Sequence, residues 1–219
     1  MAEGTPALLA HGPWEPSQVE VDWREQAFVP DAPATAAADA AVAKLRRRGS
    51  PTHDGMSARM AAFDSSPGRL RLELEPARWS LRLGQDANGA LSALCVVRDA
   101  DGRWLAGRRA AWVATWAGRW ALGAGGAVEV GENPADTLAR ELREEWSVRP
   151  QHLTIEALAR LPTGLVLLVG LARLAAGGAQ VEMDAEHDAH AWWPPDPADW
   201  PPEADGQVRR MGLLLMERG

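Results

Sequence analysis

Three glutamates lie close together in one segment of the chain: Glu141, Glu144 and Glu145. In a helix, which turns by about 100° per residue, their side chains spread over roughly 100° of the circumference. Carboxylates held this close together repel one another and raise each other's pKa values. A hard divalent cation with oxygen ligands would remove that penalty. The alternative is a solvated acidic face with Arg140 and Arg143 as neighbouring partners, which is what charge runs usually mean.

The segment that carries these glutamates has the features of a helix over residues 134–146. Asn133 suits the position that caps the helix, and Pro134 suits the first turn, where its missing N–H costs nothing. Apolar residues recur at helical spacing and would form a buried stripe; they are Ala135, Leu138, Ala139, Leu142 and Trp146. We therefore expect one face of the helix in the core and the glutamates on another face.

A longer pattern with fixed spacing surrounds the glutamates. It consists of Gly126, Glu132 after five intervening residues, Arg140-Glu141-Leu142 after seven more, then Glu144-Glu145 and Val148. This pattern resembles the signature of the Nudix hydrolases, G-x5-E-x7-R-E-U-x-E-E-x-G-U, in which U is aliphatic, and eight of the nine fixed positions are met. The departure is Ser147, where the family has a glycine that ends the helix in a left-handed conformation. Serine there costs about 1 kcal/mol or forces a different helix end.

The resemblance covers residues 88–200 and implies an α/β fold, a Nudix-type α/β/α sandwich with a mixed sheet, in a domain that we expect to span residues 88–219. The flanking residues are similar to those of the family: Arg108-Arg109 and residues 116–120 lead to Gly125-Gly126, and Glu186-His187-Asp188 precedes Trp192-Trp193. In many members the acidic loop before that strand holds another catalytic carboxylate. Residues 1–87 lie outside the resemblance, and we expect them to form an N-terminal α+β extension of unknown role.

The resemblance also implies a metal site for Mg²⁺, or for Mn²⁺ in its place. The ligands would be oxygen atoms of Glu141, Glu144, Glu145 and the carbonyl group of Gly125. The ion would neutralise diphosphate oxygens and lower the pKa of a bound water molecule. Arg140 would orient the glutamates through salt bridges, and Glu132 would support the junction between loop and helix.

Other residues are candidates for substrate binding and proton transfer. Arg108 or Arg109 could grip a diphosphate, or either could be a surface residue of a hairpin. Trp116 could stack on a base or a sugar, or it could fill the core. Glu186 is a candidate general base or additional ligand. Asp184 is the alternative to Glu186, and the acids of this loop could also be merely solvated.

The reaction that the resemblance implies is hydrolysis of a diphosphate bond in a nucleoside diphosphate linked to another moiety, of the ADP-ribose or nucleotide-sugar type. The alternative is a catalytically silent Nudix domain that acts as a nucleotide sensor or interaction module, and the intact glutamate set argues against it. The isopentenyl diphosphate isomerases share the fold but need a cysteine near the glycine pair, where this chain has Ala124. Because the chain has no tyrosine, it also lacks the tyrosine marker of the dinucleoside polyphosphate hydrolases.

Composition limits the partners of the chain. It has 219 residues and a net charge of −7, which argues against sequence-independent binding to nucleic acid, since that needs a basic surface. The single cysteine, Cys95, excludes an internal disulfide framework and a cysteine-built zinc site. No stretch approaches the ~18 apolar residues of a membrane helix. We expect a soluble cytoplasmic enzyme with a small-molecule nucleotide substrate and no nucleic-acid or membrane partner; homodimer formation stays open.

The rest of the chain alternates loosely between strands and helices, which predicts an α/β or α+β sandwich. Residues 1–30 are expected to be an irregular lead with one short strand at 19–23, followed by helices at 35–48 and 56–63. Alternating or strongly apolar segments predict strands at 70–74, 79–83, 91–98, 104–109, 153–161, 164–174 and 190–193. A last helix is expected over residues 207–216.

Overall fold

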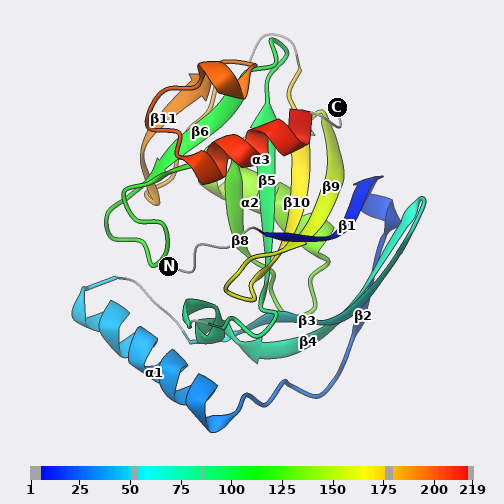
Figure 1. Cartoon of the computed structure of the whole chain (residues 1–219), viewed down its shortest axis with the longest axis vertical. Helices are drawn as coiled ribbons and strands as arrows, with labels where there is room; N and C mark the ends of the chain where they lie inside the picture. Colours follow the sequence, from blue (N-terminus) through cyan, green and yellow to red (C-terminus); the bar gives the residue numbers. More distant parts are fainter. Residues whose placement is uncertain (1–5, 51–53, 85, 176–179, 217–219) are drawn as a thin grey trace.

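The computed structural model describes residues 6–50, 54–84, 86–175 and 180–216 (Figure 1). Within these ranges eight strands form one sheet, in which six lie side by side in the order β1-β9-β10-β5-β6-β11. Their bounds are Ala7–Trp14 (β1), His152–Arg160 (β9), Val166–Arg173 (β10), Leu91–Arg98 (β5), Trp104–Arg109 (β6) and His187–Trp193 (β11). Two short strands complete the sheet, β7 (Trp120–Leu122) beside β6 and β8 (Ala124–Ala127) beside β5. Strand β10 is parallel to β5, and the other pairs are antiparallel, so the sheet is mixed.

A smaller sheet and the helices make up the other regular elements of the described residues. The smaller sheet has the order β2-β4-β3, with bounds Val19–Trp23 (β2), Arg69–Arg78 (β4) and Met56–Ser66 (β3). The α-helices are α1 (Ala32–Arg47), α2 (Pro134–Trp146) and α3 (Gly206–Met216). No helix in this part of the chain is both long and apolar enough to cross a membrane.

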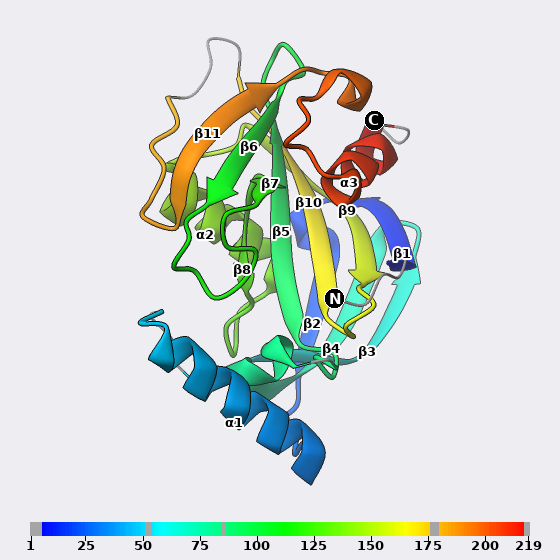
Figure 2. The ribbon, with the colours of Figure 1, turned by 60° about the vertical axis from the view of Figure 1, so that its left-hand side comes forward.

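Helices α2 and α3 lie on opposite faces of the large sheet, as Figures 1 and 2 show. Leu138 of α2 belongs to one apolar cluster together with Cys95 of β5. Val208 of α3 belongs to another cluster together with Val96 of the same strand. Cys95 and Val96 are consecutive, and successive residues of a strand point to opposite faces. The expected α/β/α sandwich with a mixed sheet is therefore confirmed.

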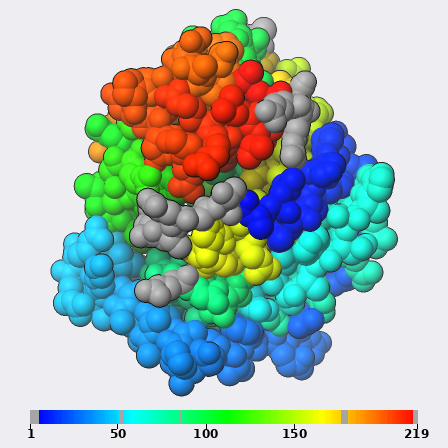
Figure 3. All heavy atoms as spheres, in the orientation of Figure 1, coloured from blue at the N-terminus to red at the C-terminus, as the bar shows by residue number. Residues whose placement is uncertain are grey.

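The smaller sheet packs against the same core as α2. Leu70, Leu72 and Leu74 of β4 are fully buried and belong to the cluster that contains Leu138. Figure 3 shows the blue-to-cyan N-terminal part of the chain lying along one side of the rest of the molecule. Strand β1 belongs to this N-terminal part, but it pairs with β9 in the large sheet. The N-terminal segment is thus joined to the sandwich by shared core and by strand pairing.

Strand β3 replaces the helix expected over residues 56–63. Alanine and methionine, which are frequent there, favour helices in isolated segments. Here the segment pairs antiparallel with β4, and Ala58 and Met60 are buried at alternate positions, so tertiary pairing overrides local propensity. Strand β1 similarly replaces part of the irregular lead expected over residues 1–30, because Trp14 is buried where β1 adds to the sheet.

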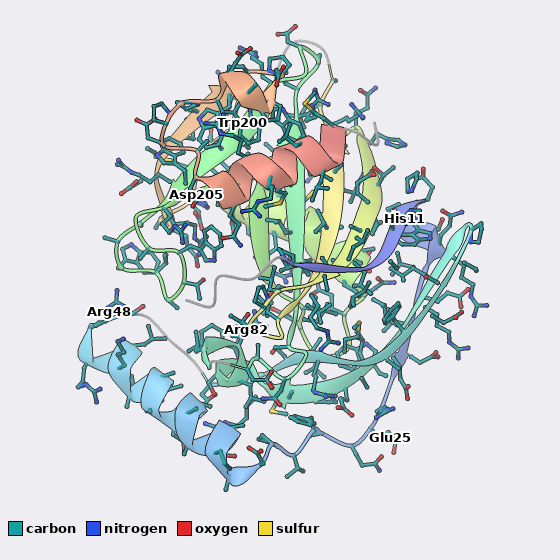
Figure 4. All side chains as sticks on the ribbon, viewed as in Figure 1. His11, Glu25, Arg48, Arg82, Trp200 and Asp205 are labelled. Carbon is teal, nitrogen blue, oxygen red and sulfur yellow. The ribbon has the colours of Figure 1, made fainter. Side chains whose placement is uncertain are left out.

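A 3-10 helix, η2 (Trp79–Leu83), takes the place of the strand expected over these residues. Leu81 is buried against Ala38 of α1. The 3-10 helix therefore buries this apolar side chain, as the expected strand would also have done. The guanidinium of Arg82, labelled in Figure 4, donates to Ser92 Oγ at 2.9 Å and ties η2 to β5. The other expected strands and helices are confirmed, with ends that differ by a few residues.

Candidate functional site

Helix α2 is closed at both ends by local hydrogen bonds. At its start, the side-chain oxygen of Asn133 accepts from the backbone N–H of Ala135 at 3.0 Å. At its end, Ser147 has φ 54° and ψ 27°, the left-handed conformation that favours glycine. The N–H of Val148 then donates to the carbonyl oxygen of Leu142 at 3.2 Å. Serine therefore ends the helix as a glycine would. The departure from the signature segment, residues 126–148, which we call the box, does not redirect the chain.

Two of the three glutamates point inward from α2 and the third points to solvent. Glu141 is 8% exposed and Glu145 is 5% exposed, whereas the side chain of Glu144 is 58% exposed. Gly126 of β8 makes room for the side chain of Glu141, because a Cβ atom at position 126 would lie 2.2 Å from Glu141 Oε1. The helix thus holds two buried carboxylates beside the glycine-containing strand, with the third at the rim.

Arg140 connects the acidic residues of the box. Its guanidinium donates to Glu132 at 2.9 Å, to Glu141 at 2.8 Å and to Glu144 at 3.0 Å. It also donates to the carbonyl oxygen of Ala127 in β8 at 3.2 Å. These contacts are the ones that an orienting arginine and a supporting Glu132 would make, and the two roles themselves stay predictions.

Only one of the two strand arginines reaches the glutamates. Arg109 Nη1 lies 3.7 Å from Glu145 Oε1, and its Nη2 donates to Glu186 at 2.8 Å. Arg108 pairs instead with Asp188 at 2.6 Å, where both side chains are 44% exposed. The two arginines are neighbours in β6 and point to opposite faces. Arg109 is therefore the one that the structure places at the candidate site, and Arg108 is not brought to it.

Glu145 is enclosed by groups from three elements. Its Oε1 accepts from the N–H of Gly125 at 3.4 Å and also faces the Arg109 guanidinium. Its Oε2 lies 3.9 Å from His187 Nε2. Burial raises the pKa of Glu145 to about 9, and Arg109 opposes that rise. Burial also raises the pKa of Glu141, again against the effect of a neighbouring arginine. For both carboxylates, the effect of burial on the pKa is thus larger than that of the neighbouring arginine.

His187 is a residue of this site that the sequence reasoning did not single out. Its side chain is 1% exposed and lies between Glu145, Asp184 and the ring of Trp146. Burial lowers its pKa, and the hydrogen bond with Asp184 acts in the opposite direction. The sequence offered only an imidazole between two acidic residues, Glu186 and Asp188. The strand was expected over residues 190–193, and the structure begins β11 at His187 and turns this side chain inward.

Three tryptophans, Trp112 and Trp116 of the loop between β6 and β7 and Trp120 of β7, pack on other parts of the fold or lie at the surface. Trp116 is half-buried against the cluster beneath α3, with the Arg119 guanidinium 4.6 Å from its ring centroid. Trp120 packs on Trp193 with ring centroids 5.6 Å apart. Trp112 is 39% exposed. Stacking of Trp116 on a substrate stays a prediction, and the structure gives it a packing role.

The donor atoms of the site fit a hard divalent cation in their chemistry. Carboxylate oxygens are the ligands that Mg²⁺ and Mn²⁺ prefer, and two of the carboxylates, those of Glu141 and Glu145, are buried. In the described ranges, no three His, Cys, Asp or Glu side chains converge as a metal site. Arginine side chains lie there instead, Arg140 between Glu141 and Glu144 and Arg109 beside Glu145.

Comparison with known proteins gives one family match. A family model described as a NUDIX domain matches residues 89–212. Similar solved structures include a MutT protein from Methanosarcina mazei Go1, with 27% identity and a TM-score of 0.39 over 47% of this chain and 75% of that one. A MutT NUDIX hydrolase from Burkholderia pseudomallei has 23% identity and a TM-score of 0.47 over 59% and 98%. A bifunctional NMN adenylyltransferase/ADP ribose pyrophosphatase from Francisella tularensis, complexed with AMP and a Mn ion, has 19% identity and a TM-score of 0.42 over 59% and 42%. Curated proteins give no match.

Proposed function

The chain belongs to the Nudix hydrolase family, and from this premise we propose that it hydrolyses a diphosphate bond in a nucleoside diphosphate linked to another moiety. The proposed substrates are of the ADP-ribose or nucleotide-sugar type. The observation that carries the proposal is the pair of buried carboxylates, Glu141 and Glu145, beside the glycines of β8. Burying a carboxylate is costly unless it is closely paired. Glu141 pairs with Arg140 at 2.8 Å, whereas the Arg109 guanidinium lies 3.7 Å from Glu145, so a bound cation would above all offset the cost of burying Glu145.

Three carboxylates of the box, those of Glu141, Glu144 and Glu145, and the carbonyl oxygen of the preceding Gly125 would hold the cation, which we propose to be Mg²⁺ or Mn²⁺. When bound, the cation would supply positive charge to the diphosphate oxygens and make a water molecule more acidic. Arg140 already contacts two of these glutamates. Its part would be to keep their carboxylates in place while the substrate is bound.

Side chains outside the box would bind the substrate and move the proton. Arg109 would donate hydrogen bonds to diphosphate oxygens, because a guanidinium suits phosphate groups. Its guanidinium lies at the candidate site, next to Glu145 and Glu186. Glu186, whose side chain is 43% exposed, would accept the proton of the attacking water. The water oxygen would bond to one phosphorus while the bridging P–O bond breaks, so each product would leave with a terminal phosphate.

The narrower substrate class is supported by a few features of the chain. The absence of tyrosine removes the marker of the dinucleoside polyphosphate hydrolases. The loop that follows Arg109 carries Trp112, which is 39% exposed and offers an aromatic surface on which a base could stack. These features favour a compound that combines a diphosphate with a nucleoside on one side.

The division of the chain and its location belong to the same proposal. Residues 88–219 would form the catalytic domain and residues 1–87 the extension. The separate sheet of β2, β3 and β4 supports this division, and β1 is the strand of the extension that crosses over to pair with β9 in the large sheet. A cytoplasmic location is supported by the single, buried Cys95, because disulfides are rare where thiols are kept reduced.

A substrate screen tests the proposal. The purified chain would be incubated with ADP-ribose, several nucleotide sugars and a dinucleoside polyphosphate, with Mg²⁺, with Mn²⁺ or with a chelator. Products would be quantified by a phosphatase-coupled phosphate assay, with a phosphatase-only control. We expect turnover of at least one nucleoside diphosphate conjugate, only when a divalent cation is present.

The second candidate function, a silent ligand sensor, makes a different prediction in the same screen. A sensor would bind a nucleotide in a calorimetric titration without converting any compound of the panel. The buried carboxylates favour catalysis over sensing, because binding a nucleotide alone does not require them. Binding without turnover under all metal conditions would reject the hydrolase.

A further inference from the structure

The loop before β11 is hydrogen-bonded to the last turn of α2. The N–H of Glu182 donates to the carbonyl oxygen of Trp146 at 3.1 Å, and the N–H of Asp184 donates to that of Glu145 at 2.9 Å. These bonds attach the loop to the backbone of the residue that bears the most deeply buried carboxylate of the box. The position of the loop and the position of Glu145 are therefore coupled.

His187 is the first residue of β11, directly after this loop, and contacts on several sides hold its ring. Its Nδ1 lies 3.2 Å from Asp184 Oδ1, and its centroid lies 4.6 Å from that of Trp146. On another side it packs against Gly107, where a Cβ atom would lie 2.6 Å from His187 Cδ2. The absence of a side chain at Gly107 in the neighbouring strand β6 thus provides the space that this imidazole occupies.

The chemistry of the partners assigns the two ring nitrogens. A carboxylate accepts hydrogen bonds and does not donate them, so the N–H is at Nδ1 and donates to Asp184. Nε2 then carries the lone pair and lies 3.9 Å from Glu145 Oε2, beyond hydrogen-bond distance. The ring limits the movement of this carboxylate without donating to it. The lone pairs of Oε2 therefore stay available to a cation.

We propose that Asp184 and His187 form a positioning pair that holds the carboxylate of Glu145 in the orientation needed to bind the catalytic cation. The inference rests on the proposed function, since it concerns the same site. Gly125 N–H and Arg109 face one oxygen of Glu145, and His187 faces the other. His187 acts through Glu145 and does not touch the substrate.

The same geometry separates this pair from Glu186. Glu186 is half-exposed and paired with Arg109, and its own N–H donates to Asp184 Oδ1 at 3.0 Å. Asp184 Oδ1 thus accepts from the backbone of the loop and from the imidazole together. The loop therefore contributes to the site in two ways, with Glu186 at the surface and the Asp184–His187 pair behind Glu145.

Four variants test the pair. His187→Phe keeps a ring beside Trp146 but removes both nitrogens, and Asp184→Ala removes the acceptor. Asp184→Asn keeps an oxygen that can accept from Nδ1. The matched control is His190→Phe, since His190 is an exposed histidine of the same strand whose ring also lies near Trp146, with centroids 6.1 Å apart. Each variant would be checked by circular dichroism and thermal melting.

Binding of Mn²⁺ would be measured by calorimetry without substrate, and kcat and KM at saturating metal. We expect His187→Phe and Asp184→Ala to weaken Mn²⁺ binding or lower kcat by about 10- to 100-fold, the range seen when partners of metal ligands are removed. KM should change little. Asp184→Asn and His190→Phe should stay close to the unmodified protein in both measurements.

Three results would overturn the positioning pair. One is unchanged Mn²⁺ affinity and kcat in both His187→Phe and Asp184→Ala. Another is an Asp184→Asn variant as defective as Asp184→Ala, since that would assign Asp184 a role through its charge or its proton. The third is an equal loss in His190→Phe. Failure of the proposed function would be seen separately, because the unmodified protein would then turn over no substrate while the Mn²⁺ titrations still report on the pair.

Discussion

Replacing Ser147 by glycine should raise the free energy of unfolding by about 0.5–1 kcal/mol. Ser147 ends α2 with φ 54°, a conformation that costs an L-residue roughly 1–2 kcal/mol. Glycine avoids this cost but loses more backbone entropy on folding, which takes back roughly 0.5–1 kcal/mol. The side chain of Ser147 is exposed, so its removal sacrifices little packing.

Urea unfolding measures this change most directly, because the midpoint should rise while the slope stays constant. For a chain of this size the thermal midpoint should rise by about 1–4 °C. Gly49, which follows α1 with φ 68° and open space around it, supplies the opposite change. Gly49→Ser should lower stability by a similar amount. If Gly49→Ser behaves so and Ser147→Gly fails to stabilise, the reasoning about strain at Ser147 is refuted.

Two further changes act on other parts of the fold. Gly126→Ala should lower kcat at least ~10-fold, because the new methyl group would displace the Glu141 carboxylate; activity assays with Gly206→Ala, where a Cβ meets nothing within 4 Å, give the control. Burial raises the pKa of Asp205, but backbone N–H groups of α3 and the Arg119 guanidinium outweigh burial and hold it below its usual value (Figure 4). Its contribution to stability is therefore complete above the unfolded-state pKa and lost as pH falls through the folded one. Urea unfolding between about pH 5 and pH 3 should show a smaller loss for Asp205→Asn than for the unmodified protein, and an equal loss would contradict this.

The box could be found in the sequence because its residues lie on one helix and the loop before it. Spacing along a helix fixes which side chains share a face, so Glu141, Glu144 and Glu145 could be grouped without knowledge of the tertiary structure, whereas the contacts of Arg140 were implied by the resemblance. At Ser147 the sequence left two outcomes open, a left-handed helix end or a different one, and the structure has the left-handed end. The large sheet could be predicted because its central strand, β5, is almost continuously apolar.

Contacts between distant segments could not be predicted in this way. Arg108 and Arg109 are equivalent in the sequence, and only the pairing of β6 with β11 decides which of them faces Glu145. His187 reaches the site because Gly107, far away along the chain, leaves space for its ring. The helix expected over residues 56–63 failed for a related reason, since pairing with β4 outweighs the helix propensity of its residues.

The most direct measurement is the rate at which the unmodified protein and Glu145→Gln hydrolyse the best substrate of the screen, with Mg²⁺ and with a chelator. Glu203→Gln, which changes an exposed glutamate before α3, is the control for the loss of one negative charge. We expect hydrolysis by the unmodified protein with Mg²⁺, none with the chelator, and a rate at least ~100-fold lower in Glu145→Gln, the scale of losing a major electrostatic contribution. Equal rates with and without the chelator, or a loss below about tenfold in a folded Glu145→Gln variant, would contradict a catalytic cation held by this carboxylate.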